Sequence, residues 1–439
     1  MRPARRTFFA SCSAFSLVLV WASTALAAAG DVDPTFSGDG YAVTSITSGW
    51  DDIGKAVAVS NNKVVIVGNT SASSTGLNFA VARYNLDGSP DTTFSGDGKW
   101  SFDFPVRPDA AHTDDEALDV AIQSDGKIVV IGRNGSRVAI VRLTTAGAFD
   151  PTFSGDGRTT FLFASAGYSE AKGVAIQSDG KIVVAGYTFG TGFGPDFGVA
   201  RVRGTDGVLD TTFSGDGLLT TDFSGGGDIA NDVALQSDGK IVVIGQTSLS
   251  SDTDVALSRY TTQGTLDTTF SGDGKQITEL NGVGDIREKM SSVALQSDGK
   301  IVVAGYRGTS TGAQFALARY TTNGGLDTSF SGDGLQYTYL ATSSSIAYGF
   351  AVAIQSNGKI VVAGRALADV WDIAVARYNT GGGLDSTFSG DGKLVDPISS
   401  GSDEGLEDVA VAADGKIVGA GWTNVAGGYD FLVARYLAA

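Results

Sequence analysis

Leu266-Asp-Thr-Thr-Phe-Ser-Gly-Asp-Gly274 decides the fold, because its last five residues occur seven times in the chain. The copies of Phe-Ser-Gly-Asp-Gly begin at Phe36, Phe94, Phe153, Phe213, Phe270, Phe330 and Phe388. Successive copies lie 57 to 60 residues apart. A constant period of this kind is typical of a chain built from one repeated supersecondary unit.

Two further motifs recur in step with the first. An arginine, usually within Ala-Arg-Tyr, occurs at Arg83, Arg142, Arg201, Arg259, Arg319, Arg377 and Arg435. A hairpin motif, Ser-Asp-Gly-Lys or a variant of it, ends at Lys63, Lys127, Lys181, Lys240, Lys300, Lys359 and Lys416. Asp-Gly between two apolar runs is a strong signal for a β-hairpin.

Each repeat predicts four short antiparallel strands. The first two flank the hairpin, as residues 120–123 and 128–131 do, and the third is clearest at residues 79–84. The fourth follows Phe-Ser-Gly-Asp-Gly, and Pro397 in one copy favours the sheet edge, where a missing amide donor costs nothing. Seven such units predict an all-β fold, a seven-bladed β-propeller.

The ends of the chain predict how the ring closes. After the N-terminal segment the chain opens with a lone fourth strand, Gly40 to Ile46, and it ends after a third strand, Phe431 to Tyr436. We expect the first strand to complete the C-terminal blade. That pairing removes two exposed sheet edges at once.

The N-terminus has the features of an export signal. Arg2, Arg5 and Arg6 precede an apolar run that ends in Ala25-Leu-Ala27. We therefore predict a signal peptide at residues 1–27, a propeller at residues 28–439, and a secreted or periplasmic location. The one cysteine, Cys12, lies in the signal, so burial rather than disulfides must stabilise the mature chain.

The charged-residue composition disfavours two classes of binding partner. Asp and Glu number 48 against 31 Lys and Arg, a formal net charge of −17. An acidic surface repels phosphate backbones and anionic headgroups. We expect neither nucleic-acid binding nor membrane insertion.

The three motifs together resemble the delta-60 repeat of exported bacterial proteins, which is regarded as propeller-forming. The resemblance covers Asp31 to Tyr436. It implies the fold and export, and no particular activity.

Two sets of repeated aspartates have different predicted roles. Asp91 and its counterparts follow the arginines, and we expect a structural pair in each blade, since buried charges are paired. Asp97 and its counterparts lie between glycines, where the side chain either accepts a bond from its own turn or helps to bind calcium. Calcium is the one possible cofactor, and both interpretations stay open.

Strand order separates two faces of the ring. The hairpins and the third-to-fourth turns share one side and are nearly identical, whereas the other loops diverge and share the opposite side. We expect binding on the variable side. Acids just before the first strand of six repeats either ring the channel mouth or cap loop amides: Asp52, Asp115, Glu170, Asp228, Glu288 and Glu404. Aromatic and basic residues there either form a recognition surface or pack the loops: Tyr187, Tyr306, Arg365, Trp371 and Trp422.

The catalytic signals are sparse. The lone His112 has neither a cysteine nor a Gly-x-Ser-x-Gly elbow to serve, so no catalytic residue is predicted and the chain is expected not to be an enzyme. The expected function is an exported binding or scaffold propeller that recognises an extracellular protein or glycan. The alternative is a carboxylate-based hydrolase or lyase, for example on glycans, with its site at the channel mouth.

Overall fold

The computed structural model describes residues 28–72, 76–105, 114–165, 167–190, 194–223, 225–248, 253–280, 288–309, 312–341 and 345–438. The predicted signal peptide lies outside these residues. Every regular element within them is a β-strand, and they include no helix that is long and apolar enough to cross a membrane.

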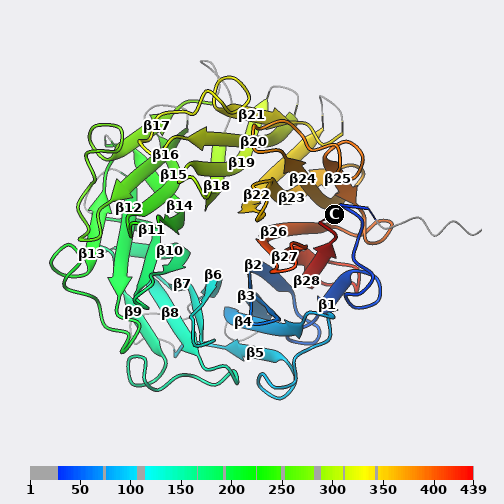
Figure 1. Cartoon of the computed structure of the whole chain (residues 1–439). Coiled ribbons are helices and arrows are strands. Elements are labelled where there is room, and N and C mark those ends of the chain that lie inside the picture. Colours follow the sequence, from blue (N-terminus) through cyan, green and yellow to red (C-terminus); the bar gives the residue numbers. More distant parts are fainter. Residues whose placement is uncertain are drawn as a thin grey trace, which may run out of the picture.

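Seven four-stranded units surround a central axis (Figure 1). The innermost strands are β2 (Asp52–Ser60), β6 (Asp115–Ile122), β10 (Tyr168–Ile176), β14 (Gly227–Leu235), β18 (Glu288–Leu295), β22 (Ile346–Ile354) and β26 (Glu404–Val411). The second strands are β3 (Lys63–Ala72), β7 (Ile128–Asn134), β11 (Ile182–Phe189), β15 (Ile241–Ser248), β19 (Ile301–Thr309), β23 (Ile360–Leu367) and β27 (Ile417–Thr423). The third strands are β4 (Gly76–Asn85), β8 (Arg137–Leu143), β12 (Pro195–Val202), β16 (Asp254–Tyr260), β20 (Gly312–Tyr320), β24 (Trp371–Tyr378) and β28 (Asp430–Tyr436). The outer strands are β5 (Lys99–Phe102), β9 (Arg158–Phe161), β13 (Leu218–Thr221), β17 (Lys275–Thr278), β21 (Leu335–Thr338), β25 (Lys393–Asp396) and β1 (Tyr41–Thr44).

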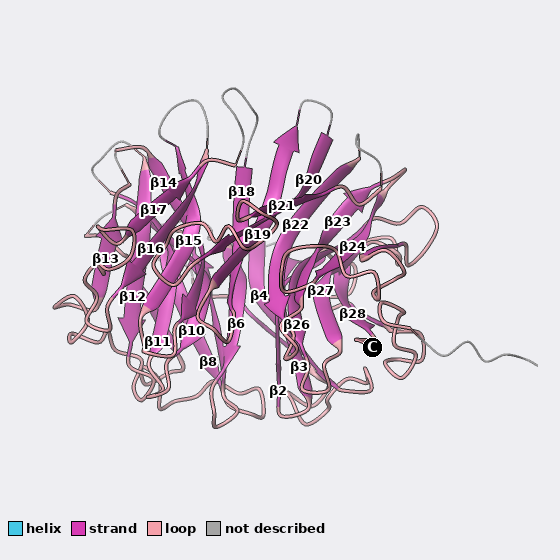
Figure 2. Ribbon diagram, turned by 45° about the horizontal axis from the view of Figure 1, so that its top comes forward, coloured by secondary structure: helices cyan, strands magenta, loops and turns pink. Residues whose placement is uncertain are grey.

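Pairing inside each unit is antiparallel and follows chain order, so the fold is a β-propeller with the strand order that the sequence predicted. The last unit differs because its outer strand comes from the N-terminus. There β1 pairs with β28, from Tyr41 opposite Ala434 to Thr44 opposite Phe431. Figure 2 shows the strands running between two loop-bearing ends of the molecule.

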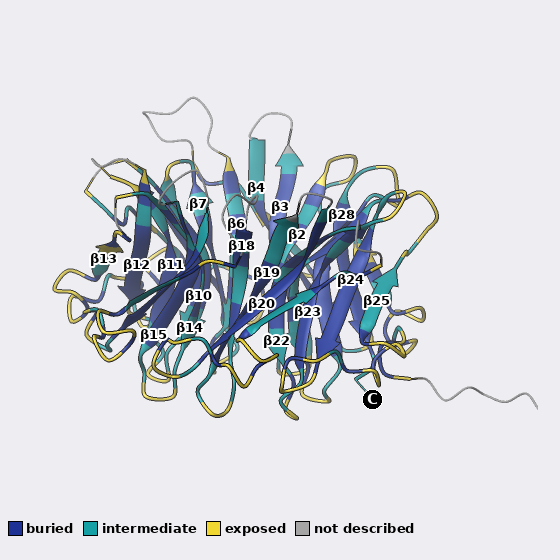
Figure 3. Ribbon diagram, turned by 90° about the horizontal axis from the view of Figure 1, so that it is seen from above, coloured by how far each residue is buried: buried dark blue, intermediate teal, exposed yellow. Residues whose placement is uncertain are grey.

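The core lies between neighbouring blades. The second and third strands are buried on both faces, which explains their continuous apolar sequences (Figure 3). One cluster joins Val65 and Phe79 of the first blade to Ala117 and Val130 of the next. A single blade therefore leaves its apolar faces open until a second blade covers them.

The three sequence motifs meet at one point in every blade, which we call the arginine node. Arg259 Nε lies 2.8 Å from an Asp267 oxygen, and Lys240 Nζ lies 3.2 Å from the same oxygen. The guanidinium carbon stands 4.8 Å from the centre of the Phe270 ring. The predicted arginine–aspartate pairs are present in all seven blades: Arg83–Asp91, Arg142–Asp150, Arg201–Asp210, Arg259–Asp267, Arg319–Asp327, Arg377–Asp385 and Arg435–Asp33.

The node also ties each blade to its neighbour. Arg259 Nη1 donates to the carbonyl of Thr322 in the next repeat. The amide of Ser271 donates to the carbonyl of Asn323 at 2.9 Å, and this contact goes with a left-handed Ser271 backbone at φ 50°. Asp273 in the same turn accepts the amide of Lys275 at 2.9 Å, which is the turn geometry expected for these aspartates.

Replacing one node carboxylate tests this account. Asp267→Asn leaves Arg259 and Lys240 without their anion, so the free energy of unfolding should fall by roughly 3 kcal/mol. Asp273→Asn, in the exposed turn of the same repeat, keeps an acceptor oxygen and should change it by less than about 0.5 kcal/mol. Urea unfolding followed by tryptophan fluorescence measures both. Equal effects of the two substitutions would contradict a special role for the node.

Candidate functional site

Five of the six acids predicted near the channel mouth cap loops instead. They are fully or almost fully buried: Asp52, Asp115, Asp228, Glu288 and Glu404. Each accepts the amide of a residue in the loop that precedes its strand; the bond from Phe223 to Asp228, for example, is 2.6 Å long. Burial raises the pKa values of Asp52, Asp115, Asp228 and Glu404, that of Asp115 to about 7. The amide-capping interpretation therefore describes these five, and a ring of acids at the mouth does not.

Glu170 is the exception, because it is out of register with the other five. In its blade the capping position is Ser169, whose hydroxyl accepts the amide of Phe163 at 3.0 Å. Glu170 comes one residue later, so its side chain lies on the opposite face of β10. There it accepts a bond from the Tyr187 hydroxyl at 3.3 Å and lies 3.6 Å from Arg133 Nε of the neighbouring blade.

Four other predicted residues gather into one group, which we call the aromatic cluster. Its members come from three adjacent blades and are Tyr306, Tyr348, Phe350, Arg365, Trp371 and Trp422. Ring centres are 4.6 Å apart for Tyr306 and Tyr348 and 5.5 Å apart for Tyr348 and Trp371. The Arg365 guanidinium lies 4.7 Å from the Trp371 ring and 5.4 Å from that of Trp422. Tyr187 lies apart, beside Tyr168 and the exposed Phe189.

Bulged residues of the innermost strands were not predicted from the sequence. Each innermost strand shifts register by one residue, and the residues left unpaired are Lys55, Leu118, Lys172, Asn231, Ser291, Phe350 and Glu407. A bulge re-aims a side chain and is frequent beside functional sites. Five of the seven bulged residues are polar or charged, and this was the only sequence signal for the position.

Three carboxylates follow the bulges and link blades through the backbone. Asp119, Asp232 and Asp408 each accept an amide of the next blade, at 2.7, 2.8 and 2.8 Å. Burial raises all three pKa values, those of Asp232 to about 6 and Asp408 to about 7, and the charges of Asp232 and Asp408 add to the rise at Asp119. The charges of Asp232 and Asp408 thus oppose ionisation of the Asp119 carboxyl.

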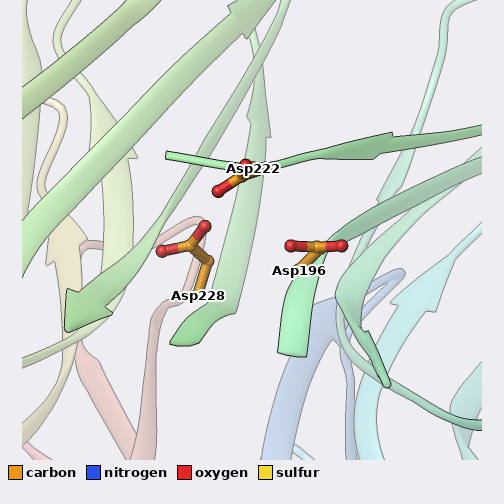
Figure 4. Close-up of side chains that lie close together, drawn as sticks. All are labelled: Asp196, Asp222 and Asp228. Carbon is orange, nitrogen blue, oxygen red and sulfur yellow. The ribbon is translucent and has the colours of Figure 1, made fainter. Parts of the chain in front are cut away.

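One acidic group among the described residues has the spacing of metal ligands (Figure 4). Asp196, Asp222 and Asp228 each offer an oxygen, and these oxygens lie within 4.8 Å of one another. Burial raises the pKa of Asp196, and the charges of Asp222 and Asp228 raise it further. Carboxylate oxygens suit a hard cation such as calcium, which stays a prediction here.

The sequence model of a family described as "Domain of unknown function (DUF5122) beta-propeller" matches residues 60–94, 123–153, 177–213, 236–270, 296–330, 355–388 and 412–438. These seven segments make up more than half of the chain. The chain belongs to this family. No curated protein matches it.

Solved structures similar to this DUF5122 propeller include a catalytically inactive virginiamycin B lyase from Staphylococcus aureus with quinupristin. That match has 13% identity and a TM-score of 0.48, and covers 90% of this chain and 99% of the other. A PL25 ulvan lyase has 11% identity and a TM-score of 0.49, covering 91% and 95%. A puromycin hydrolase has 13% identity and a TM-score of 0.46, covering 90% and 56%. At these identities the likeness concerns the fold alone.

The prediction that the chain is not an enzyme is corrected by these similarities. Lyases and hydrolases stand among the proteins of similar fold. A fold does not decide between catalysis and binding, so the lack of a serine or cysteine triad in the sequence was no ground for excluding catalysis.

Cavities on the opposite, hairpin side of the DUF5122 propeller repeat with the blades. One of about 550 Å³ is lined by Lys181 and Arg201, and one of about 660 Å³ by Lys300 and Arg319. Both hold the same node residues in equivalent places between two blades. They belong to the repeat and offer no residue that distinguishes one blade from another.

The channel carboxylates predict a pH dependence of stability. Because the pKa values of Asp119, Asp232 and Asp408 are raised on folding, the folded chain binds more protons than the unfolded chain between about pH 4 and pH 7. The free energy of unfolding should therefore fall as the pH rises through this window. Replacing all three by Asn should flatten the profile measured by urea unfolding, whereas Asp216→Asn in an exposed turn should not. An unchanged slope in the triple variant would contradict the assignment.

Proposed function

We propose that this propeller binds an extracellular or periplasmic ligand on its variable side, at the mouth of the central channel. The aromatic cluster carries the proposal. It combines four half-buried aromatic rings, the nearly buried Trp422 and one guanidinium in a single surface built by three blades. Aromatic and arginine side chains provide most of the binding energy in many recognition sites.

The distribution of sequence variation supports this location. The node residues are the same in nearly every repeat, as a structural role requires. At the position of Tyr306, Arg365 and Trp422 the other repeats have Asn69, Arg133, Tyr187 and Gln246. The seven blades thus hold five residue types at this position, and such variation is what recognition of one asymmetric ligand needs. Export by a signal at residues 1–27 and the narrower delta-60 identity remain part of this proposal.

A second candidate is a hydrolase or lyase acting on a glycan at the same mouth. The group around Glu170 favours it, since the Tyr168 and Tyr187 hydroxyls both donate to this carboxylate. Burial, then the hydrogen bond to Glu170, raise the pKa of Tyr168, so its phenol stays protonated and keeps donating this hydrogen bond. Product analysis after incubation with any bound glycan tests this candidate.

The binding proposal predicts a result on glycan and extracellular-protein arrays. The mature chain should bind a defined ligand, and Trp371→Ala should weaken binding by about 10-fold or more, because it removes the ring beneath Arg365. Trp100→Ala is the matched control, since Trp100 packs on Phe149 at the outer strand β5. Binding that survives Trp371→Ala and Arg365→Ala unchanged would move the site elsewhere.

We also propose that β1 closes the ring in solution. The terminal node supports this, because Asp33 lies 2.7 Å from Arg435 and 2.9 Å from Lys416. Asp408 of the last blade also accepts the amide of Val57 in the first.

If β1 closes the ring, Asp33 should contribute to the stability of the whole propeller although it lies near the N-terminus. Asp33→Asn should lower the free energy of unfolding by roughly 3 kcal/mol, as a node substitution inside the chain does. Removing residues 28–47 should expose the edge of β28 and produce oligomers in size-exclusion chromatography with light scattering. Asp31→Asn, at an exposed bond to the amide of Ala28, is the control. A monomeric truncated chain of full stability would refute closure by β1.

A further inference from the structure

Three lysines converge near the axis from alternate blades. Lys55 lies on β2, Lys172 on β10 and Lys289 on β18, and Lys55 and Lys172 occupy bulges. The charges of Lys172 and Lys55 both act on Lys289, although 234 residues separate Lys55 from Lys289 in the chain. We call these three residues the lysine cluster.

Few acidic side chains of the protein compensate the positive charges of the lysine cluster. Within the described residues the side chains of Lys55 and Lys289 have no hydrogen bond or ion pair, and the only acid within salt-bridge distance of Lys172 Nζ is Glu170, at 3.8 Å. The charge of Glu407 acts on Lys289, but the Glu407 carboxylate accepts a hydrogen bond from Trp422 Nε1, 2.9 Å away, and not from the lysine. Burial, then the charge of Lys172, lower the pKa of Lys289 to about 8, and the charge of Glu407 opposes both. Such cations are stabilised by an anion brought from outside.

The neighbours of the lysines are aromatic. Tyr306 pairs directly with Lys289 across β18 and β19, and it belongs to the aromatic cluster. Lys172 Nζ lies 5.6 Å from the centre of the Tyr187 ring. A ligand that reaches these lysines therefore meets flat aromatic faces, which suit the apolar faces of sugar rings.

We propose that the lysine cluster binds the carboxylate or sulfate groups of an acidic oligosaccharide whose sugar rings lie on the aromatic cluster. This inference rests on the proposed function and names its ligand class. The acidic remainder of the chain repels polyanions, so an acidic oligosaccharide is attracted to the lysine cluster and repelled elsewhere. The channel carboxylates do not occupy the lysines, because each is already held by two backbone amides.

Calorimetric titration with three oligosaccharides tests the proposal: tetragalacturonate, a chondroitin sulfate tetrasaccharide and neutral maltotetraose. At least one acidic oligosaccharide should bind, and maltotetraose should bind about 10-fold or more weakly by comparison. Lys289→Met and Lys55→Met should each weaken acidic binding by about 10- to 100-fold, the loss expected for one charge-assisted hydrogen bond. Raising NaCl from about 0.05 to about 0.5 M should weaken it as well.

Matched variants separate binding from stability. Lys393→Met neutralises a lysine on the outer strand β25, paired with the exposed Asp391, and should leave binding unchanged. Lys289→Met removes an uncompensated charge, so its melting temperature should be equal to or above that of the parent. Lys289→Arg keeps the charge and should retain more affinity than Lys289→Met.

Each outcome decides between the two proposals. Acidic binding that is lost in Trp371→Ala but unchanged in both lysine variants overturns the lysine cluster and leaves the binding function standing. Preference for maltotetraose, or no binding of any of the three, overturns the acidic ligand class. In that case the array result alone decides the proposed function.

Discussion

The buried pair of arginine and aspartate in each blade is the interaction on which the rest of the structure depends. It brings the hairpin lysine, the third-strand arginine and the Phe-Ser-Gly-Asp-Gly turn to one point, as at Lys240, Arg259 and Asp267. Because the same arginine donates to a carbonyl of the next repeat, the node orders its own blade and positions the neighbour. A repeat is thus stable only beside another repeat, because the node and the apolar faces both need contacts from the neighbouring blade.

This arrangement confines sequence variation to one side. The node, the hairpins and the left-handed serine turns share the hairpin side, where a change at a node residue removes a partner from a buried charge or a blade contact. On the other side the loop caps need only an acceptor, which Asp, Glu or Ser169 provides equally well. The remaining positions are free to differ, and the aromatic and lysine clusters lie among them.

The sequence predicted the strand order and the pairs that recur in every repeat, and it missed the register shifts and the approach of side chains from different blades. Seven equal copies were enough to derive the strand order, the arginine–aspartate pairs and the partner of β28. The bulges were not visible, because a one-residue register shift leaves the apolar pattern nearly intact. Glu170 was grouped with the capping acids although it lies four rather than five residues before the first valine of its strand; Ser169 holds the capping position. The approach of Lys55, Lys172 and Lys289 has no local signal, since each comes from a different blade.

At the central axis the seven repeats have to differ in sequence. A side chain that caps the next blade's amide beside the axis would place seven carboxylates around one narrow space if every copy were alike. Only Asp119, Asp232 and Asp408 are acidic there; the other blades have Ala56, Gly173, Ser292 and Ala351. Ser292 still accepts the amide of Val352, at 3.3 Å and without charge. Burial, then repulsion from Asp232 and Asp408, raise the pKa of Asp119, so a further acid at the axis would add to this repulsion. Copies can stay identical at the nodes because those sites lie far apart in separate blades, and they must differ at the axis because there all seven blades meet.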